Sequence, residues 1–101
     1  MTTYLFSYRL PADYTPGDPD QIEAWTAWFE TMGASVVDRG NPIFASTTLG
    51  AAEAGAGTKL GGYSLVAAED LDAAAALAKG CPVLGYEGGS VEVGEITVID
   101  H

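Results

Sequence analysis

The segment LGGYSLVAAEDLDAAAALAKGCPVLGYEGGSVEV, residues 60–93, indicates its secondary structure more clearly than any other part of the chain. Residues 60–68 predict a strand, and residues 71–79, which include four consecutive alanines, predict a helix. The glycine-rich residues 85–89 predict a turn, after which residues 90–99 predict the last strand. The segment therefore has the order strand, helix, strand.

Local signals define the ends of this helix and a special point in the strand before it. Asp70 is placed to cap the start of the helix. Gly80 ends it, and Pro82 prevents its resumption. Gly61 and Gly62 predict a bulge or a close backbone approach, because a strand interior rarely contains two glycines without such a reason. If a ligand approaches this strand, the glycines make room for it.

The N-terminal half predicts another strand and helix. Residues 3–10 alternate in polarity and predict a half-buried strand. Residues 11–20, with three prolines and three aspartates, predict a loop. Residues 20–33 predict a helix, since apolar side chains recur on one face. That stripe consists of Ile22, Trp25, Phe29 and Met32, and Trp28 extends one edge of it.

The middle of the chain is less regular. Residues 35–39 predict a short strand, and residues 40–42 predict a turn or bulge. Residues 43–49 are compatible with further extended chain. Residues 50–58, rich in glycine and alanine, contain nothing that would anchor to a core, and we expect a mobile loop.

The order β-α-β-β-α-β predicts an α+β, ferredoxin-like fold with one four-stranded antiparallel sheet. The 101 residues fit a single domain, residues 1–101. Both helices cover one face of such a sheet, and a domain of this size buries only about 60–65% of its unfolded surface. We therefore expect the other face to pair with a second copy, giving a homodimer that closes an α/β barrel.

Composition excludes several classes of function. The net charge is −10 with only four Lys and Arg residues, which disfavours nucleic-acid binding and anionic membrane surfaces. No apolar run approaches the length of a membrane span, and the alternation near the N-terminus is unlike a signal sequence. The single cysteine fits a reducing cytoplasm. No Cys/His spacing resembles a metal site, so we expect neither a metal nor another cofactor.

Several motifs resemble the YciI-like (YCII-related) family. They are Gly-Gly-Tyr-Ser-Leu (61–65), Glu-Asp-Leu-Asp-Ala-Ala (69–74), Gly-Cys-Pro (80–82), Gly-Gly-Ser-Val-Glu-Val (88–93) and the loop Asp-Arg-Gly-Asn-Pro (38–42). The resemblance covers nearly the whole chain. It implies a dimeric α/β barrel with a pocket between sheet and helices or at the dimer seam. Some relatives have been linked to dehalogenation or isomerisation through a His-Asp pair.

The chain departs from that catalytic scheme at two places. The start of the first predicted helix, residues 22–28, contains no histidine, and the only histidine is His101 at the C-terminus. The loop at 50–58 reads GAAEAGAGT, where a related subgroup has Asp-Gly-Pro-Phe. The general base of the relatives is therefore missing here, and whether the protein is an enzyme stays open.

Five polar residues are candidates for ligand contact or catalysis. Arg9 would bind an anion, or else is paired with Glu92 or exposed. Glu92 would contribute a carboxylate to the uncovered sheet face. Asp38 is the best candidate for a general base, and Asn41 for a ligand contact, although both residue types are also common in turns. Tyr63 would act as an acid or orienting donor, or else belongs to the core.

Three further residues have both a functional and a structural interpretation. Ser64 would contact a ligand beside the two glycines, but no histidine is present to activate it. Trp28 would line a pocket for a flat ring, or else belongs to the core stripe. Cys81 follows a helix C-terminus, which raises the pKa of a thiol, so we expect a packing role.

These observations give two hypotheses for function. The first is a dimeric, metal-free domain that binds a small anionic or cyclic metabolite at the sheet face or dimer seam, with lyase, isomerase or dehalogenase activity left open. The second is a non-catalytic dimeric interaction or accessory domain. The missing histidine favours the second hypothesis, while the combination of Arg9, Trp28 and Tyr63 favours the first.

Overall fold

The computed structural model describes residues 1–14, 18–50 and 57–99. It is a small α+β domain in which four antiparallel strands form an open sheet with the order β2-β3-β1-β4. The elements are β1 (Thr2–Pro11), α1 (Pro19–Met32), β2 (Val36–Asp38), β3 (Thr58–Ala68), α2 (Leu71–Ala78) and β4 (Ser90–Glu95). Short 3-10 helices at Gly33–Ser35 and Pro82–Gly85 follow α1 and α2. None of the described helices is long and apolar enough to cross a membrane.

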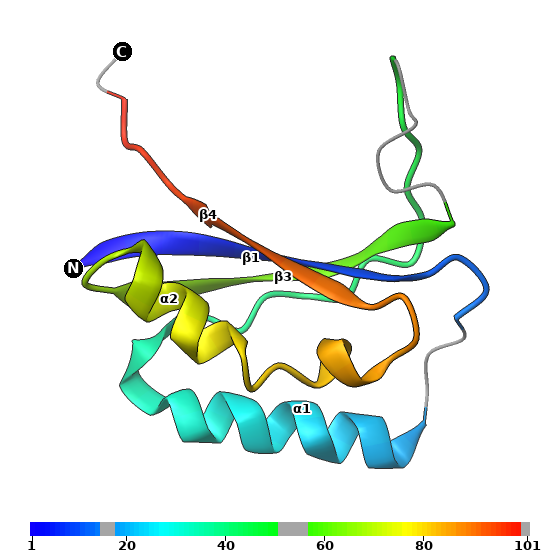
Figure 1. Cartoon of the computed structure of the whole chain (residues 1–101), viewed down its shortest axis with the longest axis horizontal. Helices are drawn as coiled ribbons and strands as arrows, with labels where there is room; N and C mark the ends of the chain where they lie inside the picture. Colours follow the sequence, from blue (N-terminus) through cyan, green and yellow to red (C-terminus); the bar gives the residue numbers. More distant parts are fainter. Residues whose placement is uncertain (15–17, 51–56, 100–101) are drawn as a thin grey trace.

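Both helices lie on one face of the sheet (Figure 1). Over the described ranges no helix covers the opposite face, and the chain just before the gap at 51–56 and the segment after β4 extend beyond the sheet on that side (Figure 1). The α+β class, the antiparallel sheet and the one-sided arrangement of helices are therefore confirmed. The predicted loop at 50–58 lies largely outside the described residues, which exclude 51–56.

Alternation along β1 produces the core, as the sequence predicts. Tyr4, Phe6, Tyr8 and Leu10 are all buried on the helix side. Side chains on alternate residues of a strand point to opposite faces, so the intervening residues lie on the uncovered face. Leu5 is one of them and remains 37% exposed.

The helix α1 begins and ends through the signals in its sequence, but its buried face differs from the predicted one. The Asp18 carboxylate accepts a hydrogen bond from the Asp20 N–H at the start, and Gly33 ends the helix with φ 56°. The centre of the buried face is Trp28, which is only 6% exposed, whereas Ile22 is 61% exposed. The expectation that Trp28 lies at the edge of the stripe is wrong, because its ring packs against β1 and its indole N–H donates to the carbonyl of Leu77 (3.1 Å).

One predicted strand is shorter in the structure, and another predicted extended segment forms no strand. The strand predicted at 90–99 ends at Glu95, because its pairing with β1 ends at Tyr4 and only the N–H of Ile96 still donates, to the Thr3 carbonyl (3.0 Å). β1 itself continues to Thr2, and over Thr2 and Thr3 its only register partners are Ala68 and Ala67 of β3. Residues 43–49 form no strand.

Gly61 and Gly62 form the bulge that the sequence predicts. In the pairing of β1 with β3, Tyr8 lies opposite Gly62 but Arg9 lies opposite Leu60, so Gly61 is the extra residue. A side chain at Gly61 would collide with that of Leu10. Because one extra residue reverses the alternation, the strand before the bulge presents the opposite set of side chains to each face.

Candidate functional site

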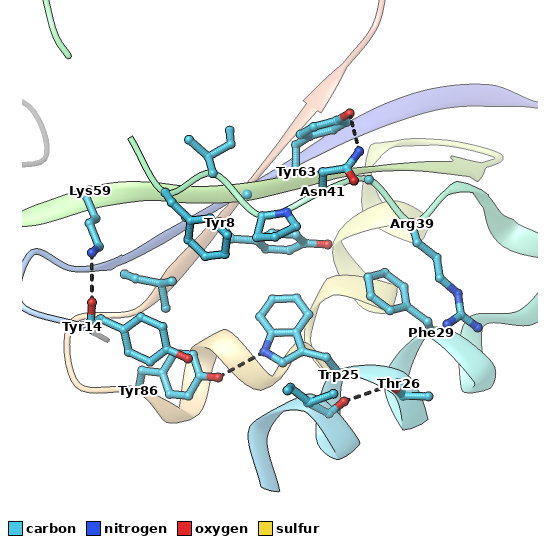
Figure 2. Close-up of a pocket in the computed structure, with 18 residues that line it drawn as sticks. Tyr8, Tyr14, Trp25, Thr26, Phe29, Arg39, Asn41, Lys59, Tyr63 and Tyr86 are labelled. Atoms are coloured by element: carbon cyan, nitrogen blue, oxygen red, sulfur yellow. Dashed lines mark hydrogen bonds between the residues drawn. The ribbon is translucent and has the colours of Figure 1, made fainter. Parts of the chain in front are cut away.

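A cavity of about 350 Å³ lies on the helix side of the sheet, between α1, residues 39–44 and the start of β3 (Figure 2). Its walls are predominantly aromatic. The contributing rings are Tyr8 of β1, Trp25 and Phe29 of α1, Phe44, and Tyr14 and Tyr86 from the connecting segments. A largely apolar cavity of this size with a few polar groups is typical of small-molecule sites.

The aromatic rings hold one another at defined angles. Tyr8 and Trp25 meet edge to face with centroids 4.7 Å apart, and Tyr14 and Tyr86 are 5.3 Å apart. The Trp25 indole N–H donates to the Tyr86 hydroxyl (3.1 Å), which links α1 to the segment before β4. Edge-to-face pairs and a satisfied indole N–H favour one arrangement of the rings, so the cavity has a fixed shape.

Residues 39–44 form a wall without regular secondary structure that is hydrogen-bonded directly to β3. The Tyr63 N–H donates to the Asn41 carbonyl (3.3 Å), and the Ile43 N–H donates to the Gly61 carbonyl (3.0 Å). Gly40 has φ 76°, and a side chain there would overlap the Tyr63 carbonyl. The wall can therefore lie this close to the sheet only because residue 40 is glycine.

A hydrogen-bond chain behind the cavity joins β1, β3 and this wall. The Tyr8 hydroxyl donates to Ser64 Oγ (2.7 Å), and Ser64 Oγ donates to the Arg39 carbonyl (2.6 Å). Ser64 is completely buried, and burial raises the pKa of Tyr8 well above its ordinary value. Tyr8 is therefore a neutral donor, and Ser64 uses its one hydrogen to hold the wall in place.

The charged side chains that line the cavity are both cationic. Lys59 and Arg39 line it, and no Asp or Glu is among the described lining residues. The Lys59 ammonium donates to the Tyr14 carbonyl (2.9 Å), while the Arg39 guanidinium lies 5.4 Å from the centre of the Phe29 ring. Asp18 lines an adjoining depression instead. In a chain with 14 Asp and Glu and four Lys and Arg, the cavity thus has a charge opposite to that of the whole molecule.

Four of the residues predicted from the sequence lie at or next to the cavity. Asn41 and Tyr63 are among its lining residues, but Tyr63 lies opposite Ser7 in the pairing with β1, so its side chain is on the uncovered face. There the Tyr63 hydroxyl accepts a hydrogen bond from the Asn41 side-chain amide (3.3 Å) (Figure 2). Ser64 and Trp28 belong to the buried core behind it and are not among its lining residues. The bulky indole at the cavity is that of Trp25, which the sequence pattern assigns to the core stripe together with Phe29.

The other three predicted residues lie elsewhere. The guanidinium of Arg9 donates to the hydroxyl of Thr58 (3.0 Å) and to its carbonyl (3.4 Å). Asp38 accepts a hydrogen bond from the Gly40 N–H (2.8 Å), which is the turn role considered as its alternative. Glu92 is exposed and pairs with Ser7 on the uncovered face of the sheet.

Sequence reasoning missed three residues of this site: Lys59, Tyr14 and Tyr86. Tyr14 and Tyr86 lie in segments whose composition predicts only a loop and a turn. Lys59 lies just before the predicted start of the strand, where the bulge reverses the alternation and places it opposite Leu10, on the helix side. The pair of glycines is the sequence signal for Lys59, because a bulge there reverses the alternation of side chains and turns Lys59 toward the helices.

Cys81 has no part in the cavity. The thiol is buried in the core, and burial raises its pKa to about 12. This agrees with the packing role expected from the sequence, although burial, not the helix dipole, is the main cause of the shift. Nowhere in residues 1–14, 18–50 and 57–99 do three or more His, Cys, Asp or Glu residues gather as a metal site would require.

Comparisons with protein families, with characterised proteins and with solved structures found no significant match for this chain.

Proposed function

We propose that this domain binds a small organic molecule with a flat ring in the cavity between α1 and the sheet. The observation that carries this proposal is a 350 Å³ cavity with aromatic walls on several elements, including Tyr8, Trp25 and Phe29. Aromatic faces attract flat rings through stacked and edge-to-face contacts. The fixed geometry of the walls also lowers the entropy lost on binding.

The lining residues support binding better than acid–base catalysis. The hydroxyls of Tyr14 and Tyr86 and the ammonium of Lys59 lie together at one end of the cavity (Figure 2), but neither a carboxylate nor a histidine is among the described lining residues. The two candidates for catalysis are also poorly placed for it, since Asp38 closes a turn and Tyr63 is bonded to Asn41. A carboxylate or histidine is the usual general base at neutral pH.

A pair of variants on α1 tests the location of the binding site. Ile22 lines the cavity and is exposed, so Ile22→Trp should obstruct the opening without disturbing the core. Ala24, exposed on the same helix and not among the lining residues, provides the matched control Ala24→Trp. A screen of flat ring compounds by thermal shift should raise the Tm of the wild type and of Ala24→Trp, but not of Ile22→Trp.

The size of the expected shift can be estimated. A ligand at 100 times its Kd adds about 2.7 kcal/mol to the free energy of unfolding. For a domain of this size that corresponds to a Tm higher by roughly 10–20 °C. A screen without any stabilising compound, or equal stabilisation of both variants, would contradict binding in this cavity.

We also propose that the domain is a ferredoxin-like member of the YciI-like family and pairs through its uncovered sheet face. The strand order β2-β3-β1-β4 supports the ferredoxin-like fold, and the motifs shared with the YciI-like family support the membership. Pairing through the uncovered face is supported by two apolar side chains on that face, Leu5 and Leu65, which lie opposite each other in β1 and β3. This face is also the observation that favours the alternative function, a dimeric interaction domain.

Light scattering tests the dimer independently of any ligand. Leu5→Arg places a charge in the middle of the uncovered face and should give a monomer at micromolar concentration. Leu84→Arg is the matched control, because Leu84 is 48% exposed and lies in the 3-10 helix Pro82–Gly85, outside the sheet. A wild-type protein with the mass of a monomer would refute the pairing.

A further inference from the structure

We propose that the cavity selects aromatic carboxylates and that Lys59 is the residue that binds the carboxylate. This inference rests on the proposed binding function and adds the class of ligand and the residue that recognises it. It starts from the ammonium of Lys59, which is half-buried at the cavity and donates to one carbonyl, that of Tyr14 (2.9 Å).

The ammonium of Lys59 can donate more hydrogen bonds than the Tyr14 carbonyl accepts. An ammonium group has three hydrogens to donate, and the Tyr14 carbonyl uses one of them. None of the described residues that line the cavity carries a negative charge. Because Lys59 is half-buried, its ammonium keeps only part of its contact with water. An anion in the cavity would pair with the charge and accept the remaining hydrogens.

Tyr14 and Tyr86 lie beside Lys59 at the cavity (Figure 2). The Tyr86 hydroxyl accepts from the Trp25 indole and also interacts with the Tyr14 hydroxyl. Burial raises the pKa of Tyr86, so that it stays protonated and brings no competing negative charge. Figure 2 shows Lys59, Tyr14 and Tyr86 together at one end of the cavity, with Trp25 beside them. A polar, positively charged end thus adjoins an aromatic slot.

The arrangement fits a single negative charge joined to a flat ring. Arg39, the other cation of the cavity, lies on the far side of Tyr8 and Trp25 from Lys59 (Figure 2), is exposed, and stacks over Phe29. A phosphate or a compact dianion at Lys59 would therefore meet only one cation there. A carboxylate carries one charge and is satisfied by one ammonium with neighbouring hydroxyl donors.

Calorimetric titration with a matched pair of probes, 2-naphthoate and the uncharged 2-naphthamide, tests this inference. The two probes share the same flat ring, and only the carboxylate can pair with Lys59. We expect the wild type to bind 2-naphthoate more tightly. Lys59→Met should weaken 2-naphthoate binding about 10–100-fold, the range for a hydrogen bond to a charged group, and leave 2-naphthamide binding unchanged.

Two further variants complete the test. Lys59→Arg keeps the charge and should restore most of the affinity for 2-naphthoate. Lys79→Met removes an equal charge from the exposed C-terminal end of α2, outside the cavity, and should have no effect. Because 2-naphthamide binding reports on the cavity itself, it also verifies that Lys59→Met is folded.

The outcomes separate the two proposals. If both probes bind equally to the wild type and Lys59→Met changes neither affinity, the carboxylate inference is overturned while the proposed binding function stands. If neither probe binds at millimolar concentration, both proposals fail. If Lys79→Met weakens 2-naphthoate binding as much as Lys59→Met does, the loss comes from the change in net charge. Lys59 is then not the residue that binds the carboxylate.

Discussion

Gly40 lies where a side chain on the wall of the cavity would collide with the sheet, and Gly40→Ala tests that close approach. Its φ is 76°, and a methyl group there would overlap the Tyr63 carbonyl. Gly33 is a matched control, because it also has positive φ (56°) but a methyl group added to it would meet no atom within 4 Å. A strained backbone costs about 1–3 kcal/mol in either variant, and only Gly40→Ala adds a collision.

The collision can be relieved if residues 39–44 move away from β3. That movement breaks the bond from Ser64 Oγ to the Arg39 carbonyl and the bond from the Tyr63 N–H to the Asn41 carbonyl. At about 0.5–1.5 kcal/mol for each bond, Gly40→Ala should lose about 1–3 kcal/mol more than Gly33→Ala. The extra loss corresponds to a Tm lower by roughly 5–20 °C in a domain of this size.

Urea unfolding followed by tryptophan fluorescence, with calorimetry for the Tm, measures both variants. The slope of the free energy of unfolding against urea should stay constant, which shows that the folded state keeps its compactness. If Gly40→Ala and Gly33→Ala unfold at the same midpoint, the close approach of the wall to Tyr63 does not contribute to stability, and the reasoning is refuted.

Three other predictions concern stability, pH and ligand contact. Ser64→Ala should cost about 1–3 kcal/mol, because it leaves the Tyr8 hydroxyl without its buried acceptor; adding Tyr8→Phe should cost less than the sum of the single changes, and additive losses in a double-mutant cycle would exclude the coupling. Burial raises the pKa of Cys81 from 9.0 to about 12, so the unfolded chain loses this proton first and the free energy of unfolding should fall as pH rises from 9 toward 12. The free energy of unfolding of Cys81→Ala should fall less over that pH interval, as measured by urea titrations at stepped pH. A fall equal to that of the wild type would contradict the raised pKa of Cys81. Arg9→Ala should bind flat carboxylates as tightly as the wild type does, since Arg9 contacts Thr58 outside the cavity; a loss of affinity by calorimetry would support the role that the sequence suggested for Arg9.

The sequence predicted the secondary structure well where the signal is local. Alternation in residues 3–10 and the capping Asp70 depend on neighbours along the chain, and both predicted elements appear. The end of β4 and the buried face of α1 depend on distant partners instead. The pairing of β4 with β1 stops at Glu95 although β1 continues to Thr2. Trp28 is central because Phe6 and Tyr8 lie beneath it.

The cavity was harder to predict because it joins segments that are distant in sequence. Asn41 and Tyr63 were predicted individually, but only the folded chain brings residues 39–44 against Gly61 and Gly62. Lys59 was missed because a simple alternation through β3 would place it on the uncovered face. The extra residue in the bulge turns it toward the helices, and that reversal follows from the pairing register, not from composition.

The opposite charges of the cavity and of the whole molecule have a consequence for the kinetics of binding. A carboxylate that approaches from bulk solvent first meets the field of a protein with net charge −10, and only then the ammonium of Lys59. The range of that field shrinks from about 30 Å at 0.01 M salt to about 10 Å at 0.1 M. Added salt should therefore raise the association rate constant, the reverse of the usual effect of electrostatic steering. Such a protein would capture its ligand faster at the ionic strength of a cell than in dilute buffer.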